Sequence, residues 1–431
     1  MKAYPKYKSS GIDWLGEIPS HWRCVKIKNV VSCNDEVLSE NTDKDRQIEY
    51  VEISDVTYEK GITGSSKFLF KDAPSRARRI TQKGDVIIST VRTYLKAIAR
   101  IVDTNPIVST GFAVIRPLGV DPSFLFYAIS SNGFLNEVQK YSTGVSYPAI
   151  TSQELINLRC ALPPIEEQKA IAGYLDEVTA KVDTLMAEKR AQVEDLRKYR
   201  TSLITETVTR GLNPNVPIKQ TNSEWFPNIP TNWSIEKFKY QATVKANLVH
   251  PTDYIQHPQI SPDSIEKNTG RLLGYKSVEE AGIISDNHLF YKGQIIYSKI
   301  RPNLNKVIIA PFNGLCSADM YPIETLNNVR YFQYLMLSNP FVSQVSVVIQ
   351  DRVKMPKINQ VELGEILILV PPISEQKQIA DYLDEKTAKI DSLVEELEAQ
   401  IGDLATYRQA VITEAVTGKI DVREWSNPSK N

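Results

Sequence analysis

The chain has 431 residues, of which 42% are hydrophobic and 24% charged, and its 51 basic and 51 acidic residues cancel. This length is enough for two or three domains of ordinary globular composition. No run of about 18 apolar residues and no apolar leader is present, so neither a membrane span nor a signal peptide is predicted. The four cysteines form no C-x-x-C pair. Together these features predict a cytoplasmic protein without structural zinc.

Two tryptophan motifs mark the starts of two repeated units. Trp14–Trp22 and Trp225–Trp233 both read W-x-x-x-I-P-x-x-W, and alternating residues typical of a strand follow each. Further matching segments recur along both units at offsets of 208 to 211 residues, so the chain contains two copies of one plan. Residues 40–80 and 247–290 do not align. The pattern therefore indicates a repeated frame that carries two different surfaces, suited to two recognition tasks.

Positive charge is concentrated in residues 60–116, which contain eleven basic and three acidic residues. Residues 371–414, in contrast, contain four basic and ten acidic residues, so the neutral total hides a segregated charge. A basic surplus of this size suits a phosphate backbone. The plain alternative is a solvated face, and the aromatic Tyr94 among the cations weighs against it.

The strand that ends at Arg92 is the sharpest candidate for contact with nucleic acid. Arg92 and Arg301 hold the same place in both copies, which favours a phosphate or scaffold role, whereas Tyr94 and Asn303 differ and are candidates for reading bases. A second candidate loop, Ser142–Tyr147 with its counterpart at residues 351–354, could equally be a plain turn. The predicted DNA-binding residues are Arg76, Arg78, Arg79, Arg92, Tyr94, Lys96, Thr143, Ser146, Tyr147, Lys299, Arg301, Asn303, Asn305, Lys306, Arg352 and Lys354.

The longest repeat follows a pair of prolines in each unit. Of the 50 positions from Pro163 to Leu212, 29 are identical to Pro371–Ile420. Each copy has about 40 proline-free residues rich in helix formers, which predicts two helices about 60 Å long. The predicted seam at steps of seven consists of one row, Leu175, Val182, Lys189, Leu196 and Leu203, and a second row, Ile171, Val178, Leu185, Gln192 and Tyr199, with matching rows in the second copy (Leu383, Ile390, Leu397, Leu404, Val411; Ile379, Lys386, Leu393, Gln400, Tyr407). Gln192 and Gln400 occupy the same seam position, where a polar residue can fix register.

A search for catalytic motifs is nearly empty. The chain has no G-x-x-x-x-G-K-[ST] and no G-x-G-x-x-G sequence, and its two Pro-Pro pairs lack the flanks of an adenine methyltransferase motif. Its four histidines have no metal-ligand spacing. We therefore expect a non-catalytic chain without a metal site or a cofactor of its own.

The Ile-Pro-x-x-Trp motifs, the paired segments at Lys83 and Lys292 (K-G-[DQ]-[VI]-I), and the two Pro-Pro-Ile-x-Glu-Gln-Lys motifs resemble the specificity (S) subunit of Type I restriction–modification enzymes. The resemblance covers essentially the whole chain. It implies an α+β fold in which two β-rich mixed target recognition domains are joined by two long antiparallel helices that form a coiled coil, as a pseudo-two-fold internal repeat. The expected boundaries are recognition domain 1 at 1–162, the central helix at 163–210, a linker at 211–221, recognition domain 2 at 222–370 and the C-terminal helix at 371–424.

The resemblance also implies partners. Each recognition domain would read one half of an asymmetric bipartite site in double-stranded DNA, and the helices would set the spacer. Two methyltransferase subunits would bring S-adenosylmethionine, and restriction subunits would bring ATP and Mg. Residues identical in both helices but off the seam are the predicted partner contacts: Gln168, Tyr174, Asp176, Gln376, Tyr382 and Asp384.

Alternatives remain at each level. The off-seam residues could instead hold the helix starts against the recognition domains. The whole chain could serve a related two-component system with a fused nuclease–methyltransferase partner, or be a coiled-coil scaffold that binds only proteins. A duplicated catalytic protein is disfavoured because the shared positions are mostly apolar, Gly, Pro or helix seam.

Overall fold

The computed structural model describes residues 2–425, which form two compact units. The first unit contains residues up to 188 together with those from 400 onward, and the second contains residues 189–399. Each unit thus consists of one recognition domain and the parts of both long helices that pack on it. Among the described residues, no helix is both long and apolar enough to cross a membrane.

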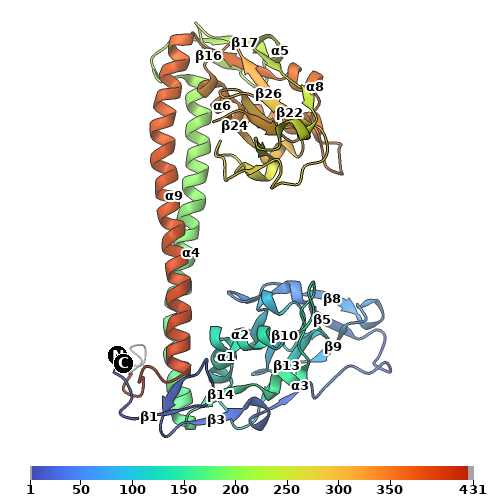
Figure 1. The fold of residues 1–431 in the computed structure, drawn as a ribbon, viewed down its shortest axis with the longest axis vertical. Coiled ribbons are helices and arrows are strands. Elements are labelled where there is room, and N and C mark those ends of the chain that lie inside the picture. The colour runs from blue at the N-terminus through green and yellow to red at the C-terminus, as the bar shows by residue number, and fades with distance from the viewer. Residues whose placement is uncertain (1, 426–431) are drawn as a thin grey trace. The chain divides into compact units, whose positions relative to one another are not determined.

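The recognition domain of the first unit is built on two four-stranded sheets, with strand orders β11-β10-β13-β4 and β8-β5-β12-β9 (Figure 1). All pairs in them are antiparallel except β5 with β12. The strands are β1 (Tyr7–Ser9), β2 (Glu17–Pro19), β3 (Arg23–Lys26), β4 (Val31–Cys33), β5 (Gln47–Val51), β6 (Val56–Thr57), β7 (Gly61–Ile62), β8 (Ser66–Leu69), β9 (Ala77–Ile80), β10 (Val86–Ser89), β11 (Ile98–Arg100), β12 (Ile107–Ser109), β13 (Phe112–Pro117) and β14 (Arg159–Leu162). The helices are α1 (Pro122–Ser130), α2 (Asn132–Lys140) and α3 (Ser152–Asn157).

The recognition domain of the second unit has sheets of order β18-β26-β23-β24 and β19-β22-β25-β20-β21. Its strands are β15 (Ile218–Gln220), β16 (Asn228–Pro230), β17 (Ser234–Lys237), β18 (Ala242–Val244), β19 (Leu248–Val249), β20 (Pro258–Ile260), β21 (Lys276–Ser277), β22 (Asn287–Phe290), β23 (Ile295–Ser298), β24 (Val307–Ile309), β25 (Gly314–Cys316), β26 (Met320–Thr325) and β27 (Leu367–Val370). Its helices are α5 (Phe238–Gln241), α6 (Val329–Leu337), α7 (Asn339–Ile349) and α8 (Gln360–Glu365).

The two recognition domains share most of their topology, although the second sheet has four strands in the first domain and five in the second. In each first sheet, a central antiparallel pair (β10 with β13, β23 with β26) carries one outer strand on either side. The second sheet of each contains a single parallel pair, β5 with β12 and β20 with β25. The frame is therefore repeated even across residues 40–80 and 247–290, where the two sequences do not align. Divergence there affects side chains and loops more than strand order.

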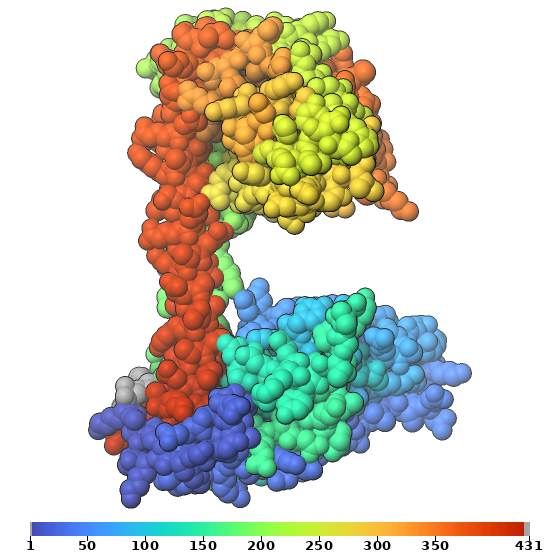
Figure 2. Space-filling model, in the orientation of Figure 1, coloured from blue at the N-terminus to red at the C-terminus, as the bar shows by residue number. Residues whose placement is uncertain are grey.

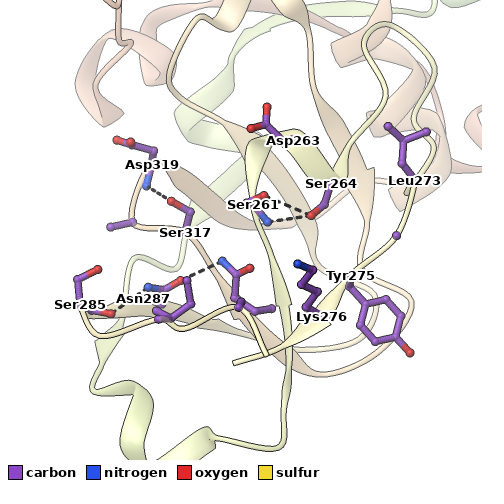
Figure 3. A pocket seen from close by; sticks show the side chains of 15 residues that line it. Ser261, Asp263, Ser264, Leu273, Tyr275, Lys276, Ser285, Asn287, Ser317 and Asp319 are labelled. Carbon is purple, nitrogen blue, oxygen red and sulfur yellow. Dashed lines mark hydrogen bonds between the residues drawn. The ribbon is translucent and has the colours of Figure 1, made fainter. Parts of the chain in front are cut away.

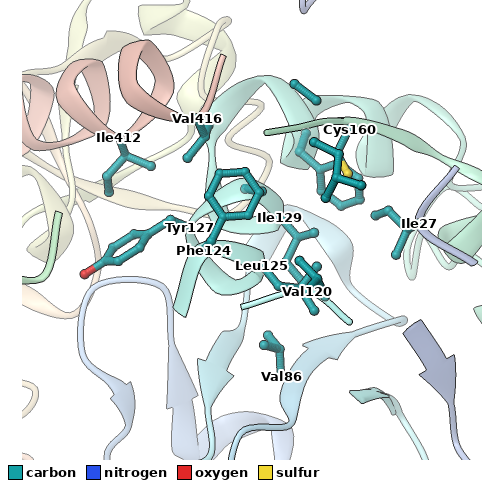
Figure 4. Packing of buried hydrophobic residues seen from close by; sticks show 14 of the residues in the cluster. Ile27, Val86, Val120, Phe124, Leu125, Tyr127, Ile129, Cys160, Ile412 and Val416 are labelled. Atoms are coloured by element: carbon teal, nitrogen blue, oxygen red, sulfur yellow. The ribbon is translucent and has the colours of Figure 1, made fainter. Parts of the chain in front are cut away.

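Each unit has a core that joins the recognition domain to the long helices. In the first unit, Phe124 and Tyr127 of α1 are buried in one cluster with Ile412 and Val416 from the C-terminal helix (Figure 4). Trp22 of the first tryptophan motif is fully buried in this cluster. Burial of large side chains of this kind contributes about 2 kcal/mol each. The recognition domain and the helix ends of a unit therefore form one packed body.

The long helices are α4 (Ile165–Arg210) and α9 (Ile373–Val416), which begin directly after the proline pairs, as predicted. They lie side by side (Figure 1). In the first unit, Asp183 of α4 pairs with Arg408 of α9, and in the second unit Arg200 of α4 pairs with Asp391 of α9. Because the later residue of α4 meets the earlier residue of α9, the helices are antiparallel, which confirms that part of the expected fold.

The first apolar row lies in the helix seam in both copies, because all ten of its members are buried or half-buried. The prediction for the second row is wrong for several of its middle members. Leu185, Gln192 and Tyr199 are exposed, as are Leu393 and Tyr407, and their places in the seam are taken by Met186, Val193 and Arg200, with Val394, Ile401 and Arg408 in the other copy.

The physical reason is helical drift. A straight helix has 3.6 residues per turn, so a strict seven-residue stripe rotates by about 20° per heptad. Beside the first row, a series of buried or half-buried residues repeats every eleven residues, which is about 3.67 per turn. The series runs Ile171, Val182, Val193 and Ile204 in α4, and Ile379, Ile390, Ile401 and Ile412 in α9. Gln192 therefore does not fix register, and the duplicated polar residues of the seam are Arg200 and Arg408.

Candidate nucleic-acid interface

In the first recognition domain, the structure brings the two predicted loops together. Residues 89–96 leave the end of β10, and residues 141–150 follow α2. The backbone N–H of Ile150 donates to the carbonyl of Thr90 at 2.9 Å, and the hydroxyls of Thr93 and Ser142 lie 2.8 Å apart. The two loops thus form one continuous surface at the edge of the first sheet.

The second recognition domain repeats this construction with residues 298–305 and 350–358. The backbone N–H of Arg301 donates to the carbonyl of Pro356 at 2.8 Å, and that of Ile358 donates to the carbonyl of Lys299 at 3.0 Å. Two loops that lie about 50 residues apart in sequence therefore meet at the same place in both copies.

Backbone conformation at this surface is duplicated as well. Arg92 and Arg301 adopt left-handed φ angles of 50° and 45°, and so do Lys96 and Asn305 at 50° and 47°. Each pair brackets a one-turn 3-10 helix. A left-handed residue other than glycine costs about 1 kcal/mol or more, and such residues cluster at functional sites. Both arginines are exposed to solvent.

The surroundings of the two arginines differ. The guanidinium of Arg92 lies over the ring of Tyr147, 4.8 Å from its centroid. The position equivalent to Tyr147 in the second copy is Met355, so a cation–π contact of this kind has no aromatic partner there. The two equivalent arginines therefore have chemically different neighbours.

Several predicted DNA-binding residues are accessible on these loops. In the first copy, Tyr94, Thr143, Ser146 and Tyr147 are exposed, and in the second Asn303 and Lys354 are exposed. Lys96 is half-buried, with its Nζ 3.4 Å from Asn132 Oδ1, and Lys299 lies with its Nζ 5.0 Å from the ring centroid of Tyr321.

Three of the predicted residues in the second copy are either buried or engaged in contacts within the domain. Asn305 is only 1% exposed, so it cannot reach DNA in this conformation. Lys306 is largely buried, and its Nζ donates to the carbonyl of Pro262 at 2.7 Å. Arg352 donates to the Glu362 carboxylate and to the carbonyl of Lys357, and the hydrogen bond with Glu362 raises the pKa of its guanidinium. Lys306 and Arg352 thus hold the loops through contacts within the domain, although Arg352 remains exposed. The buried Asn305 amide has no hydrogen-bond partner among the described residues.

Arg76, Arg78 and Arg79 lie on or beside β9. Arg76 is exposed, Arg78 lies over the ring of Phe70 at 4.8 Å, and Arg79 donates to the carbonyl of Thr110 at 3.3 Å. Burial lowers the pKa of Arg79. Of these three, Arg76 is the residue best placed for contact with a phosphate.

The basic surplus of residues 60–116 also serves the fold. Arg116 binds the buried carboxylate of Asp85 through its Nε and Nη2 at 3.0 Å, and it also reaches Glu36. Hydrogen bonding to Asp85 is the main cause that raises the pKa of Arg116. The count of charges in this segment therefore overstates the cationic surface.

A cleft in the second recognition domain was not predicted. It has a volume of about 830 Å³ and is lined by Gln259, Asn287 and Lys276, among others (Figure 3). Its residues 259–287 belong to the yellow-green and yellow segment that forms much of the visible surface of this domain (Figure 2). Gln259 and Asn287 are buried in its wall, whereas Lys276 is exposed. Residues 247–290 match nothing in the first copy, so no repeat drew attention to them.

This cleft adjoins the Arg301 loop. Asp319 on its rim accepts a 2.8 Å hydrogen bond from Lys357 Nζ, and its carbonyl accepts from the backbone N–H of Lys299 at 3.0 Å. The polar cleft and the cationic loop thus belong to one region of the second recognition domain.

The predicted partner contacts at the helix starts lie against the recognition domains. Gln168 accepts from the N–H of Asp121 at 2.8 Å, and Gln376 accepts from that of Asn328 at the same distance. Gln168, Gln376 and Tyr174 are buried. A buried side chain offers no surface to another subunit, so these three fit the alternative, in which they hold the helix starts in place.

The two aspartates have a similar task but remain partly accessible. The hydroxyl of Tyr127 donates to Asp176 at 2.7 Å, and that of Tyr334 donates to Asp384 at 2.9 Å. Tyr382 is half-buried, with Lys386 Nζ 5.6 Å from its ring centroid. Contact of Asp176, Asp384 and Tyr382 with another subunit stays a prediction.

A third duplicated contact joins motifs that sequence reasoning treated separately. The indole N–H of Trp22 donates to Glu167 at 2.8 Å, and that of Trp233 donates to Glu375 at 3.0 Å. Each tryptophan motif is thereby fastened to the glutamate of its own Pro-Pro-Ile-x-Glu-Gln motif. In each copy, the two motifs together connect the recognition domain to the start of its long helix.

Comparison with known proteins agrees with this architecture. The family described as Type I restriction modification DNA specificity domain matches residues 19–195 and 237–402. The specificity subunit of the type I restriction enzyme EcoDI from Escherichia coli is 32% identical over 327 residues, which span 72% of this chain and 73% of that protein. The EcoKI specificity subunit from Escherichia coli K12 is 19% identical over 72% of this chain and 68% of its own length.

The fold is also found among solved structures. A chain from a structure of a type I R-M system superposes with a TM-score of 0.70 at 20% identity, covering 94% of this chain and 99% of that one. Because the family match spans both repeats, and a relative above 30% identity covers more than two thirds of the chain, the assignment rests on both copies. The chain belongs to the family of Type I restriction modification DNA specificity proteins.

Proposed function

We propose that this chain is the non-catalytic subunit that selects the DNA sequence for a Type I restriction–modification complex, with each recognition domain reading one half of an asymmetric bipartite site. The observation that carries the proposal is the duplicated loop surface: the same strained arginine stands in both copies, surrounded by different side chains. An arginine shared by both copies suits contact with the phosphate backbone, because the backbone is the same in every DNA sequence. Neighbouring side chains that differ between the copies suit contact with bases, because the bases differ between the two half-sites.

The second recognition domain offers more polar groups to its half-site than the first one does. Besides Asn303 and Lys354 on the loops, the exposed Tyr275 and Lys276 line the cleft beside the Arg301 loop. A tyrosine and a lysine that line a cleft next to a phosphate-binding cation are placed to contact phosphates and base edges. In the first recognition domain, Tyr94 and Tyr147 are the corresponding exposed groups on the loops.

The antiparallel helices suit the role of spacer and docking frame. We propose that two methyltransferase subunits bind this frame and bring S-adenosylmethionine, and that restriction subunits add ATP- and Mg-dependent cleavage. A system with a fused nuclease–methyltransferase partner would use the same frame. The exposed row of Leu185, Tyr199, Leu393 and Tyr407 on the helices supports a protein contact there.

Sequencing of methylated sites in a randomised DNA library tests the proposal. The chain is assembled with its methyltransferase and incubated with S-adenosylmethionine. We expect one bipartite motif whose two halves differ in sequence and are separated by a spacer of fixed length. Methylation without any sequence preference, or with only one recognised half, would contradict the proposal.

A further inference from the structure

Both recognition domains carry exposed apolar side chains at the same three positions of the loop surface. We define the first apolar tip as Leu95, Val145 and Tyr147, and the second apolar tip as Leu304, Val353 and Met355, at offsets of 208 or 209 residues. All six are exposed, and Val145 and Val353 are almost completely so. Single exposed apolar residues are ordinary, but three equivalent ones retained in two otherwise divergent loops indicate a shared task.

The tips are held outward by the fold. In the first, Thr143 and Ala149 exchange two backbone hydrogen bonds of 2.9 Å, which close the loop beneath Val145. In the second, the Arg352 guanidinium closes the loop beneath Val353 by binding the Lys357 carbonyl and the Glu362 carboxylate. An apolar group fixed in water in this way is preorganised for an apolar partner.

Charge around the tips identifies that partner. Residues 89–96 and 141–149 contain Arg92 and Lys96 and no acidic residue. The corresponding segments 298–305 and 350–358 contain five cations and the single acid Asp351. Of these cations, Arg352 and Lys357 pair with Glu362 and Asp319, and the other three are Lys299, Arg301 and Lys354. A partner that joins apolar surface to dense negative charge is duplex DNA, in which stacked bases lie between phosphate chains. A protein partner would need an acidic rim around an apolar pocket, and nothing in the loops favours one.

We propose that each apolar tip is a wedge that enters the DNA duplex between neighbouring base pairs of its half-site. The inference rests on the proposed function and adds a mechanism to it. Insertion of such side chains partly unstacks one base step and kinks the helix. Because both tips are apolar, the wedge acts in the same way in both halves. It would favour steps that unstack easily, such as TA and CA, at positions without hydrogen-bonded base contacts.

Fluorescence of 2-aminopurine, which rises when the base loses its stacking, tests the wedge. The chain assembled with its methyltransferase is bound to target duplexes that carry 2-aminopurine at successive positions of each half-site. The adenine that becomes methylated is left unsubstituted, because methyltransferases flip their target base out of the duplex. We expect increased fluorescence at one step in each half-site.

Substitutions then assign each signal to a tip. Val145→Ser should abolish the increase in the first half-site alone and Val353→Ser that in the second alone. Each change should weaken specific binding about tenfold. Val145→Ile should retain the signal. Since both valines lie in solvent, unfolding temperatures should not change.

Leu118→Ser and Leu326→Ser are the matched controls. Both leucines are exposed, and they follow β13 and β26 at the ends of these strands away from the loops. These variants should keep both signals and full affinity.

The outcomes separate the wedge from the function on which it rests. Specific binding with flat fluorescence at every step would overturn the wedge and leave sequence recognition intact. Loss of methyltransferase assembly in the Val145→Ser or Val353→Ser variant would show that the tip contacts protein and would also overturn the proposal. Absence of any sequence preference in the unaltered complex would overturn the proposed function, and the wedge with it.

Discussion

Arg200 and Asp391 form a two-point ion pair across the helix seam, with Nε–Oδ1 and Nη2–Oδ2 distances of 2.8 and 3.2 Å. Arg408 and Asp183 repeat this pair at the same distances. Arg200 also donates to the backbone carbonyls of Asn268 and Thr269. The seam pair in the second unit therefore also fastens a loop of the recognition domain to the helices.

Removing one partner of the more buried pair should be costly. Asp391→Asn leaves the buried guanidinium of Arg200 without its counter-charge, and we expect a loss of about 3 kcal/mol in the free energy of unfolding. Asp183→Asn affects the more exposed Arg408 pair and should cost about 1 kcal/mol or less. Urea unfolding of the two variants compares them. Equal losses would show that the additional contacts of Arg200 contribute nothing.

The corrected seam can be tested at two adjacent residues. Met186 is 4% exposed and Leu185 is 46% exposed. Met186→Glu buries an unpaired carboxylate and should destabilise the chain by about 3 kcal/mol, whereas Leu185→Glu should change stability by about 0.5 kcal/mol or less. Thermal unfolding distinguishes them. The reverse order would restore the seven-residue seam.

Arg92→Ala should weaken binding to all DNA sequences. If the exposed guanidinium contacts a phosphate, its loss lowers the slope of log affinity against log salt by about one unit and leaves the methylated motif unchanged. Arg301→Ala should act in the same way. A changed base at one position with overall affinity intact would instead place Arg92 among the base-reading residues, whose loss costs about 1–3 kcal/mol at one base pair.

Tyr94→Asn introduces the side chain that stands at the equivalent position in the second copy. Since Tyr94 is exposed on the first loop surface, the variant should alter the preferred sequence of one half-site only. Methylated-site sequencing reads both halves at once. The reciprocal change Asn303→Tyr is the matched control and should alter the other half. An equal effect of Tyr94→Asn on both halves would contradict the division of labour between the copies.

The loop beneath the second apolar tip should open in acid. Hydrogen bonding from Arg352 is the main cause that lowers the pKa of Glu362. A carboxylate with a lowered pKa in the folded state stabilises it above the unfolded value, about 4.3, and this contribution is lost as pH falls through the folded value. Amide exchange of residues 350–358, corrected for its intrinsic rate, should therefore increase below about pH 4. In Glu362→Gln the protection should already be reduced at neutral pH, and protection independent of pH in the unaltered chain would refute this role.

The frame was predictable because its evidence is local and duplicated. The proline pairs begin both long helices, and the tryptophan motifs begin both domains. The seam was only partly predictable, because seven- and eleven-residue repeats share members such as Val182 and separate only further along the helix. Burial at Ile171, Val182, Val193 and Ile204 decides between them.

The loop surface was also only partly predictable from the sequence. Arg92 and Tyr147 were each found from sequence, but their stacking depends on sheet geometry across more than 50 residues. Asn305 is 1% exposed, and its burial depends on how the loop packs on the domain, which residue type alone does not reveal. The cleft around Gln259 was not predicted, because most of its residues have no matching segment in the first copy.

The eleven-residue seam also determines how these helices can change in length. Insertion of eleven residues in both helices restores every seam residue to the same face and adds three turns, about 16 Å. That increment corresponds to roughly five base pairs at 3.4 Å each. An insertion of seven would rotate the inserted turns slightly out of phase, and one of five would turn the apolar stripe toward water. If the helix pair sets the distance between the two half-sites, as we propose, that distance would change in steps of three helical turns.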